Sequence, residues 1–465
     1  MTRFFSPRRI GGRRPSPCAD WKSGLETRMS DRKNCVLAYS GGLDTTAIVV
    51  WLREQGYDVH TVLVDVGQEE DVTALCEKAL RLGAKTAVAR DARPLMCRAI
   101  LPYAAGLAAT YEGTYRLGTA LARPFIALEQ VRRARELGGA TLAHGATGKG
   151  NDQIRFEFAY RSLAPEMPVV APWKIWDLSG RRDLIDYIRA HGIEDDFELT
   201  KTYSMDENLW HLSVEGGALE DPAADVDVDE VLAAVASRFA GGVSAACSVP
   251  HAAGRTTITF HKGVPLALDG AAMEMSELVT TLNHRHRAAP WAWDLVIENR
   301  FTGIKSRGLY INPAAKLLHT AADALARTCL NKPLYDHYAA LGRDYGATIY
   351  RGEYFSDQRV VLERAADAVM AHLTGAVTVD LSHSPYVAKI DAPQAIFSQR
   401  LATFEQSTFS HKDADGFIRL AWLTAVGRSA PEAGNVHAVE TRHTAASDLR
   451  PGEHQPARRL VPAAV

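Results

Sequence analysis

Short apolar runs alternate with helical spacings of apolar residues in the first part of the chain. Strands are predicted at Val36–Tyr39, Val59–Val64, Lys85–Ala89 and Ala140–Ala143, and helices at Thr45–Gln55, Asp71–Leu82 and Phe125–Leu137. Glycines follow each of these helices, as expected where a helix ends. Strands and helices joined in this order by short turns predict βαβ units, with a parallel sheet covered on both faces. Ligands of such sheets bind beyond the carboxyl ends of the strands.

The pattern changes after about residue 200. Strands are predicted at Thr256–His261, Val264–Leu268 and Ala376–Leu381, and helices at Asp229–Phe239, Leu317–Cys329 and Asp357–Leu373. This mixture indicates a second domain of the α+β type. We place the first domain at residues 34–198 and the second at residues 199–424.

The two ends of the chain lack this periodicity. Residues 1–33 are rich in arginine and interrupted by prolines, and residues 425–465 mix Ala, Pro, Glu, His and Arg. We interpret them as a disordered leader and a disordered tail. An organelle-targeting peptide, or a true start at Met29, remains an alternative for the leader; a secretory signal would need an apolar stretch that is missing there.

Composition narrows the class of protein. The chain has 465 residues, of which 46% are hydrophobic and 23% charged, and its formal net charge is -2. These values are typical of a globular protein and argue against a nucleic-acid-binding surface or a polybasic membrane anchor. No apolar run approaches the ~20 residues of a membrane span. The scattered cysteines, without a C-x-x-C pair, suggest a reducing, cytoplasmic location and no zinc site; we interpret the His284–His286 pair as part of a solvated helix face.

The sharpest motif is the segment Ser40–Thr46, SGGLDTT, between the first predicted strand and helix. Gly41 and Gly42 let backbone amides approach an anion closely. The following helix start adds unpaired N–H groups and a positive dipole end. Hydroxyls of Ser40, Thr45 and Thr46 complete a phosphate-binding site. The spacing is not that of a Walker A loop, and a simple strand-to-helix turn would not need Asp44.

A second glycine cluster, His144–Asp152, follows the strand predicted at Ala140–Ala143. Its glycines again allow a ligand to approach the backbone, and Thr147, Asn151 and Asp152 supply polar groups. Arg155 lies one helical turn beyond Asp152 and can face the same ligand. Two such loops at the same edge of one sheet are stronger evidence for a binding site than either loop alone.

These motifs are similar to those of known families. The first loop resembles the S-G-G-x-D-[ST] loop of the PP-loop, or N-type ATP pyrophosphatase, group. Both loops together resemble the argininosuccinate synthase family, in which matching segments follow one another over about residues 35–422. The segments are Leu37–Thr45, Gly67–Gln68, Tyr115–Pro124, His144–Asp152, Ala171–Trp173, Tyr203–Leu209, Gly263–Pro265, Glu298–Arg300 and Lys305–Tyr310.

The resemblance implies a fold and a reaction. The fold would be α/β, with a parallel doubly wound nucleotide-binding domain followed by an α+β synthetase and multimerisation domain. The reaction would be the ATP-dependent ligation of L-citrulline to L-aspartate, with release of AMP and pyrophosphate through a citrullyl-adenylate, in arginine biosynthesis. ATP and Mg²⁺ would be required, and the protein would be a cytoplasmic homotetramer that binds neither nucleic acid nor membrane.

The resemblance also implies residue roles. Ser40, Asp44 and Asp152 would be catalytic, and no protein residue is assigned to a metal. ATP would be held by Ala38, Tyr39, Ser40, Gly41, Gly42, Leu43, Asp44, Thr45, Thr46, Val64 and Gly145. Aspartate would be bound by Thr147, Asn151 and Asp152. Citrulline would be bound by Tyr115, Asn151, Arg155, Ser204, Ser213, Glu298 and Tyr310, with Ala120 at a position that is often Ser in the family.

The chemistry of these side chains fits two zwitterionic substrates. Arg155 can pair with a carboxylate through two hydrogen bonds, and Glu298 and Asp152 can accept from ammonium groups. Departures at Ala120, at Trp291–Asp294 and at residues 313–315 leave a related ligase for another ureido or amide acceptor as an alternative. A PP-loop tRNA-modifying enzyme is disfavoured by the charge and the cysteine spacing, and a protein without turnover by the intact loops.

Overall fold

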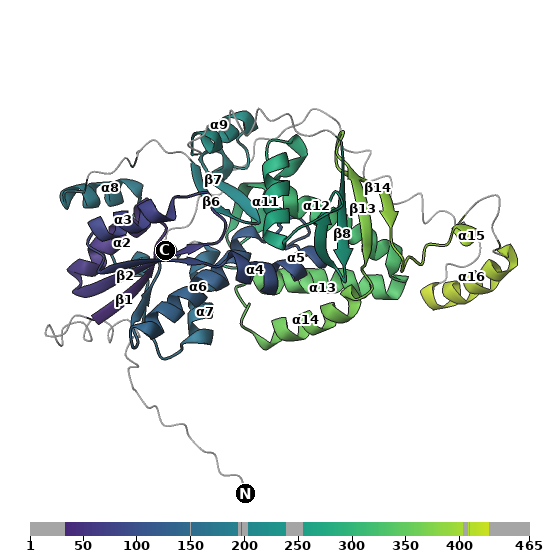
Figure 1. Cartoon of the computed structure of the whole chain (residues 1–465), viewed down its shortest axis with the longest axis horizontal. Helices are drawn as coiled ribbons and strands as arrows, with labels where there is room; N and C mark the ends of the chain where they lie inside the picture. The colour runs from purple at the N-terminus through teal and green to yellow at the C-terminus, as the bar shows by residue number, and fades with distance from the viewer. Residues whose placement is uncertain are drawn as a thin grey trace, which may run out of the picture. The chain divides into compact units, whose positions relative to one another are not determined.

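The computed structural model describes residues 33–148, 150–193, 197, 203–238, 254–402, 408 and 410–426. The chain divides into two units, residues 1–396 and 397–465. Figure 1 shows the first unit with its sheets and helices labelled. Residues 1–32 of the predicted leader, residues 427–465 of the predicted tail, Lys149 and Phe239 lie outside the described residues.

A parallel five-stranded sheet with the order β3-β2-β1-β4-β5 forms the N-terminal part of the first unit. Its strands are β1 (Lys33–Ala38), β2 (Tyr57–Asp65), β3 (Thr86–Asp91), β4 (Thr141–Ala143) and β5 (Val169–Val170). The helices of this part are α2 (Leu43–Glu54), α3 (Val72–Arg81), α4 (Arg93–Ala99), α5 (Leu101–Gly106), α6 (Gly118–Glu136), α7 (Asn151–Leu163) and α8 (Arg181–Ala190), with the 3₁₀ turn η1 (Pro172–Lys174). The predicted parallel sheet is confirmed.

Alternate residues of β1 face opposite sides of this sheet, as the strand period requires. Cys35 and Leu37 pack in a cluster with α2 and α3. Val36 instead belongs to the larger cluster that includes Leu121 of α6 and Phe156 of α7. Helices therefore cover both faces, as expected of a doubly wound domain.

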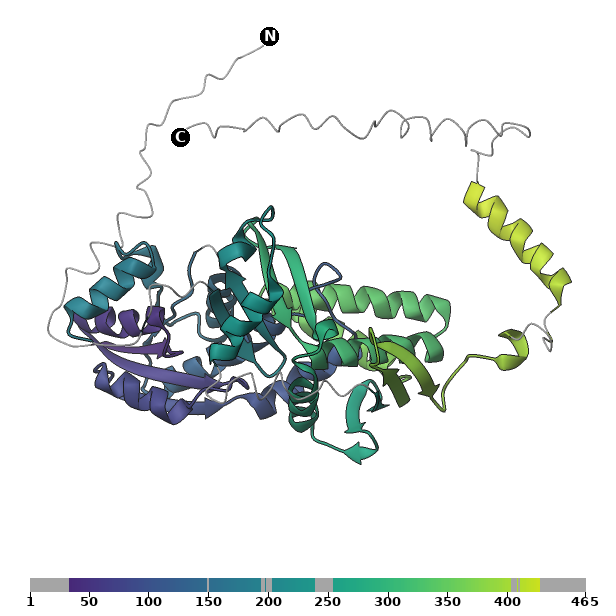
Figure 2. The same cartoon turned by 90° about the horizontal axis from the view of Figure 1, so that it is seen from above.

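The C-terminal part of the first unit contains two antiparallel sheets, with orders β10-β9-β8-β13-β14 and β11-β12-β7-β6. Their strands are β6 (Tyr203–Asn208), β7 (His211–Gly216), β8 (Arg255–His261), β9 (Val264–Leu268), β10 (Ala271–Ala272), β11 (Trp293–Asn299), β12 (Lys305–Ile311), β13 (Gly375–Asp380) and β14 (Tyr386–Asp391). The helical elements are η2 (Gly217–Glu220), α9 (Val228–Arg238), α11 (Met275–His286), η3 (Pro290–Ala292), α12 (Pro313–Cys329), α13 (Lys332–Tyr350) and α14 (Asp357–Met370). Seen from above, the yellow-green strands β13 and β14 lie beside green helices, of which α12 contacts both strands (Figure 2).

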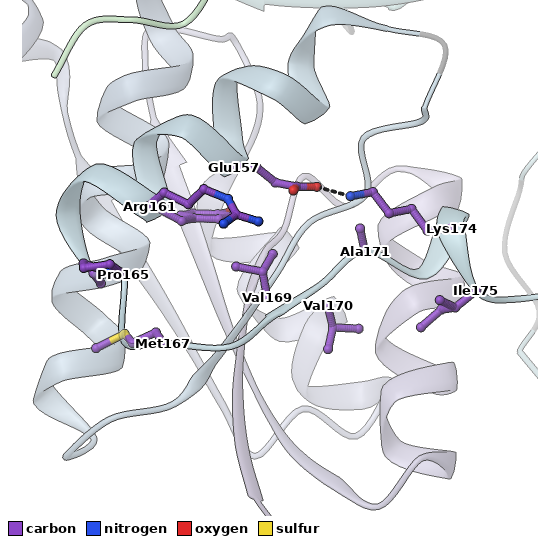
Figure 3. A pocket seen from close by; sticks show the side chains of 11 residues that line it. Glu157, Arg161, Pro165, Met167, Val169, Val170, Ala171, Lys174 and Ile175 are labelled. Carbon is purple, nitrogen blue, oxygen red and sulfur yellow. Dashed lines mark hydrogen bonds and ion pairs between the residues drawn. The ribbon is translucent and has the colours of Figure 1, made fainter. Parts of the chain in front are cut away.

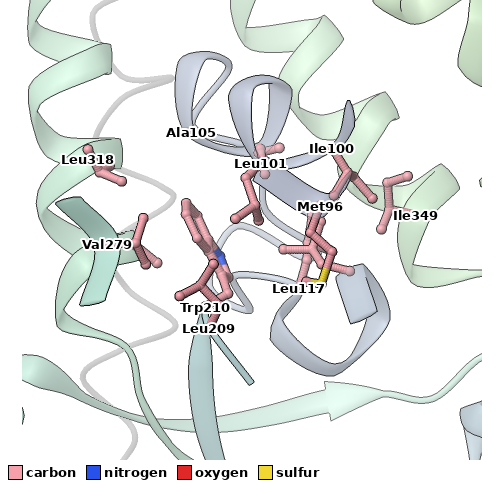
Figure 4. Close-up of a cluster of buried hydrophobic side chains, with 14 of the residues drawn as sticks. Met96, Ile100, Leu101, Ala105, Leu117, Leu209, Trp210, Val279, Leu318 and Ile349 are labelled. Carbon is pink, nitrogen blue, oxygen red and sulfur yellow. The ribbon is translucent and has the colours of Figure 1, made fainter. Parts of the chain in front are cut away.

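One hydrophobic cluster joins the two parts of the first unit. Figure 4 shows Trp210, between β6 and β7, surrounded by Leu101 of α5, Leu117 before α6 and Val279 of α11. The Trp210 side chain is fully buried, and its Nε1 donates to the Arg116 carbonyl at 2.9 Å. The β6–β7 hairpin is thereby fixed against the N-terminal part, which places its polar residues beside α6.

Some predicted element bounds are wrong. Helix α6 begins at Gly118, seven residues before the predicted start, and accommodates Pro124 in its interior. A proline inside a helix removes one backbone hydrogen bond and crowds the fourth preceding carbonyl. The helix nevertheless continues through Pro124, with Leu121, Phe125 and Ala127 buried beside it. His286 is buried beside Trp291, so the interpretation of His284–His286 as a solvated face holds for the exposed His284 alone.

The second unit contains α15 (Gln399–Ala402) and α16 (His411–Val426) among its described residues. Apolar side chains of α16 are largely exposed, namely Phe417, Ile418, Leu420, Trp422 and Leu423. None of the described helices of the chain is both long and apolar enough to cross a membrane.

Candidate active site

The phosphate-binding loop predicted from the sequence connects β1 to α2. Gly41 has φ +74°, and a Cβ there would lie 2.3 Å from Leu75 Cδ2, so glycine is required. Gly42 is the N-cap of α2 in an extended conformation, and no side chain of the described residues caps that helix. Ser40 Oγ lies 3.3 Å from Thr45 Oγ1 and accepts from Gly42 N at 3.4 Å. The open helix end and the hydroxyls form a cradle for an anion.

The second glycine loop lies directly beside the first. A Cβ on Gly145 would lie 3.2 Å from Ile48 Cδ1, 3.3 Å from Thr45 Cγ2 and 3.8 Å from Asp44 Cβ. Burial raises the pKa of the Asp44 carboxyl, and its backbone N–H and the charge of Arg181 act in the opposite direction. The two loops thus meet at the first turn of α2, and a ligand of one would contact the other.

Charged side chains form a series of ion pairs beside these loops. Asp152 accepts from Arg155 Nη1 at 2.9 Å through one oxygen and from Arg123 Nε at 2.9 Å through the other. Arg123 also donates to Asp206 Oδ2 at 2.7 Å. Burial alone would raise the pKa of Asp152, but the charges of Arg123 and Arg155 outweigh it and the pKa is lowered. Asp152 is therefore ionised at neutral pH, with a guanidinium group on each of its two oxygens.

A buried carboxylate lies close to these ion pairs. Glu298, on β11, is 5% exposed. Its Oε1 accepts from Tyr310 OH at 3.2 Å and from Ser306 Oγ at 3.3 Å, and its Oε2 accepts from Tyr350 OH at 3.0 Å. Hydroxyl donors on both oxygens orient the carboxylate without neutralising it. A buried carboxylate held in this way can accept hydrogen bonds from a cationic group such as an ammonium.

Helix α7 contributes two side chains to the same region. Asn151 Nδ2 donates to Tyr350 OH at 2.9 Å, and Asn151 Oδ1 accepts from Phe301 N at 2.8 Å. Arg155 Nε donates to the Tyr350 carbonyl at 3.0 Å. Tyr115 lies edge-on to Tyr350, with ring centroids 5.7 Å apart. Residues as far apart in the sequence as Tyr115 and Tyr350 thus contribute to one cluster.

The remaining predicted site residues are less central. Ser213 is buried on β7, pairs in register with Tyr310 and donates to the Asp206 carbonyl at 3.2 Å. Ala120 is buried in α6, and Val64 is buried in β2. Ser204 and Thr147 are exposed.

Three polar residues of the cluster were not singled out from the sequence. Arg123 and Asp206 lie inside the matching segments 115–124 and 203–209, so their charges were the available signal. Tyr350 lies in none of the matching segments. It ends α13, and its role follows from packing alone.

Within the described part of the chain, no group of His, Cys, Asp and Glu side chains is arranged to hold a metal ion. A cavity of about 360 Å³ is lined by Glu157, Arg161, Val170 and Lys174, among others (Figure 3). At 100° per residue these α7 positions lie roughly 80° to 160° around the helix from Asn151 and Arg155, and the lining includes neither of them. The cavity is therefore distinct from the polar cluster.

Comparisons with known proteins show to which family the chain is similar. The family described as "Arginosuccinate synthase N-terminal HUP domain" matches residues 34–194, and "Arginosuccinate synthase C-terminal domain" matches residues 203–426. Argininosuccinate synthase of Nitratidesulfovibrio vulgaris (strain DP4) is 40% identical over 405 residues, covering 86% of this chain and 99% of the relative. That of Moorella thermoacetica is 39% identical over 391 residues, 83% of this chain and 94% of the relative. That of Desulfitobacterium hafniense (strain Y51) is 37% identical over 402 residues, 86% of this chain and 96% of the relative. The chain belongs to the argininosuccinate synthase family.

Proposed function

We propose that this chain catalyses the ATP-dependent ligation of L-citrulline and L-aspartate to argininosuccinate, with release of AMP and pyrophosphate, as a step of arginine biosynthesis. One observation carries the proposal: an uncapped helix start between two glycine loops lies beside a buried cluster of carboxylates and guanidinium groups. The first feature suits a nucleotide phosphate, and the second suits two amino acids.

ATP would lie over the loop Ala38–Thr46, next to Val64 and Gly145. The backbone amides at the start of α2 and the hydroxyls of Ser40 and Thr45 would hold the phosphate groups. Mg²⁺ would lower the repulsion between the phosphates and the incoming oxygen. Mg²⁺ usually binds through phosphate oxygens and only one or two protein carboxylates. The first turn of α2 contains one acidic side chain, Asp44.

The two amino acids would occupy the polar cluster. Aspartate would be bound by Thr147, Asn151 and Asp152. Citrulline would be held by Arg155 at its carboxylate and by Glu298 at its ammonium group, and the surrounding residues would be Tyr115, Ala120, Ser204, Ser213 and Tyr310. The buried charges would hold each substrate in one orientation.

The reaction would need no covalent enzyme intermediate. The ureido carbon of citrulline is a poor electrophile because two nitrogens donate electrons to it. Its oxygen can attack the α-phosphorus of ATP, and pyrophosphate then leaves along the Ser40–Thr46 loop. The amine of aspartate, near Asp152, next attacks the activated carbon, and AMP departs with the ureido oxygen. The chain's contribution is to position the substrates and to stabilise charge on the phosphate.

A ligase for another ureido or amide acceptor is the less favoured candidate, since the relatives quoted above are named argininosuccinate synthase over nearly their whole length. We further propose a cytoplasmic homotetramer as the working form.

Pyrophosphate release tests this function. We expect sustained release of pyrophosphate from ATP only when citrulline and aspartate are both present. Omitting either amino acid should stop turnover. Citrulline labelled with heavy oxygen at the ureido group should give labelled AMP and unlabelled pyrophosphate by mass spectrometry. Ligation with unlabelled AMP would exclude the adenylate, and reaction with a different ureido compound in place of citrulline would favour the second candidate.

A further inference from the structure

Tyr350, the last residue of α13, connects three side chains of the polar cluster. It is 1% exposed. Its hydroxyl donates to Glu298 Oε2 at 3.0 Å and accepts from Asn151 Nδ2 at 2.9 Å. The other two hydroxyl donors to Glu298, those of Tyr310 and Ser306, bond to Oε1 instead. Removal of the Tyr350 hydroxyl would leave Glu298 Oε2 and Asn151 Nδ2 each without the hydrogen bond that the hydroxyl provides.

The ring and the backbone of Tyr350 contact the third side chain, that of Arg155. The Arg155 guanidinium lies 5.0 Å from the ring centroid, and Arg155 Nε donates to the Tyr350 carbonyl at 3.0 Å. On its other side the ring stacks on Tyr111, with centroids 3.6 Å apart and planes 6° from parallel. The stack fixes the plane of the Tyr350 ring, and so the surface on which Arg155 rests.

The backbone after Tyr350 is shaped for this contact. Gly352 has φ +82°, and a Cβ there would lie 2.8 Å from the Arg155 Cα. A side chain at this position would push the end of α13 away from α7. Close approach of the two helices therefore depends on the glycine two residues beyond the tyrosine.

We propose that Tyr350 is a positioning residue for the amino-acid-binding part of the site. Its hydroxyl orients Glu298 and Asn151, and its ring and carbonyl orient Arg155. The inference rests on the proposed function, in which those three side chains bind citrulline and aspartate. It assigns no contact of Tyr350 with ATP, so the two halves of the site should respond differently to its loss.

Tyr350→Phe tests the hydroxyl while it keeps the ring. Loss of a hydrogen bond to a charged group predicts that kcat/KM for citrulline falls about 10- to 100-fold. The KM for aspartate should rise as well, because Asn151 serves both amino acids, and the KM for ATP should stay nearly unchanged. The matched control is Tyr345→Phe on the same helix, whose hydroxyl donates to Glu363 at 3.3 Å, outside the site. It should leave all three constants unchanged.

Two further measurements separate positioning from general stability. In a double-mutant cycle with Glu298→Gln, the effects of the two substitutions on kcat/KM for citrulline should be less than additive, because they remove one shared contact. Gly352→Ala should reproduce the amino-acid defect with the Tyr350 hydroxyl still present. Its control is Gly270→Ala, at φ +83° with no atom within 4 Å of the added Cβ, which carries the same backbone strain alone.

The outcomes are distinguishable. Equal rises of the KM for all three substrates, additive effects in the cycle, or unchanged citrulline kinetics in Tyr350→Phe would each overturn the inference. Wild-type protein that forms no argininosuccinate from citrulline and aspartate would instead refute the proposed function on which it rests.

Discussion

Alanine substitutions at the two adjacent glycines of the phosphate loop should affect different properties, namely stability at Gly41 and ATP binding at Gly42. Gly41 has φ +74°, and an added Cβ would lie 2.3 Å from Leu75 Cδ2. Gly42 has φ -70° and ψ 172°, which any residue adopts, and its added Cβ would meet only Ser40 Oγ, at 3.4 Å. Gly41→Ala should therefore destabilise the fold, and Gly42→Ala should place a methyl group where a phosphate approaches.

The size of each effect follows from these geometries. A left-handed backbone costs an L-residue about 1–2 kcal/mol, and overpacking typically adds about 1–3 kcal/mol. We expect Gly41→Ala to lower the free energy of unfolding by the sum of these two costs. Movement of the Leu75 side chain would reduce the overpacking part. Gly42→Ala should lower it by about 1 kcal/mol or less, as for a helix N-cap. It should raise the KM for ATP about 10- to 100-fold, the equivalent of one hydrogen bond to a charged group.

Thermal unfolding and pyrophosphate release measure these two quantities. The control is Gly56→Ala, at φ +80° with no atom within 4 Å of the added Cβ, which reports the backbone strain alone. Gly41→Ala should be less stable than this control. An ATP dependence unchanged in Gly42→Ala would remove the loop from phosphate binding, and equal stability of Gly41→Ala and Gly56→Ala would contradict the predicted clash.

Further predictions concern the amino-acid cluster and pH. Glu298→Gln and Arg155→Ala should each raise the KM for citrulline about 10- to 100-fold with little change in the KM for ATP; an equal rise for ATP would show that the predicted roles are wrong. Asp152→Asn should raise the KM for aspartate more than that for ATP, as steady-state kinetics can show, and the reverse order would refute its assignment. Burial, with the nearby Arg116, lowers the pKa of His319 from 6.5 to about 3, so the unfolded chain binds more protons and stability should fall as the pH drops from about 6.5 towards 3. Denaturant titrations of His319→Leu should show a shallower loss over this range, and an unchanged slope would contradict the buried neutral histidine.

Local patterns were sufficient to predict the nucleotide-binding half. The strand Val36–Tyr39, the glycines and the helix Thr45–Gln55 are contiguous, and the structure places them as β1, the loop and α2 within a few residues. Burial on both faces makes parallel strands continuous apolar runs, which are easily recognised. The bounds of α6 were missed because a proline usually ends a helix, and only tertiary packing shows that Pro124 does not.

The amino-acid half could be predicted only in part. Arg155 was chosen because it lies one helical turn beyond a glycine loop, and Glu298 and Tyr310 through the family resemblance. Tyr350 is 195 residues from Arg155, the residue that its carbonyl binds, and no local periodicity marks it. Contacts of such sequence separation depend on the packing of whole domains, which hydrophobic spacing does not specify.

The position of Tyr350 in the chain has a consequence for protein synthesis. The ribosome completes the strands β1–β5 and both glycine loops by residue 170, but α13 ends 180 residues later. Domains fold as units in the order in which they emerge. A nascent chain could thus acquire its nucleotide-binding loops well before Tyr350 holds Glu298, Asn151 and Arg155 in place. Partial chains would then lack an ordered acceptor site, and ATP held by them would meet no correctly placed ureido oxygen.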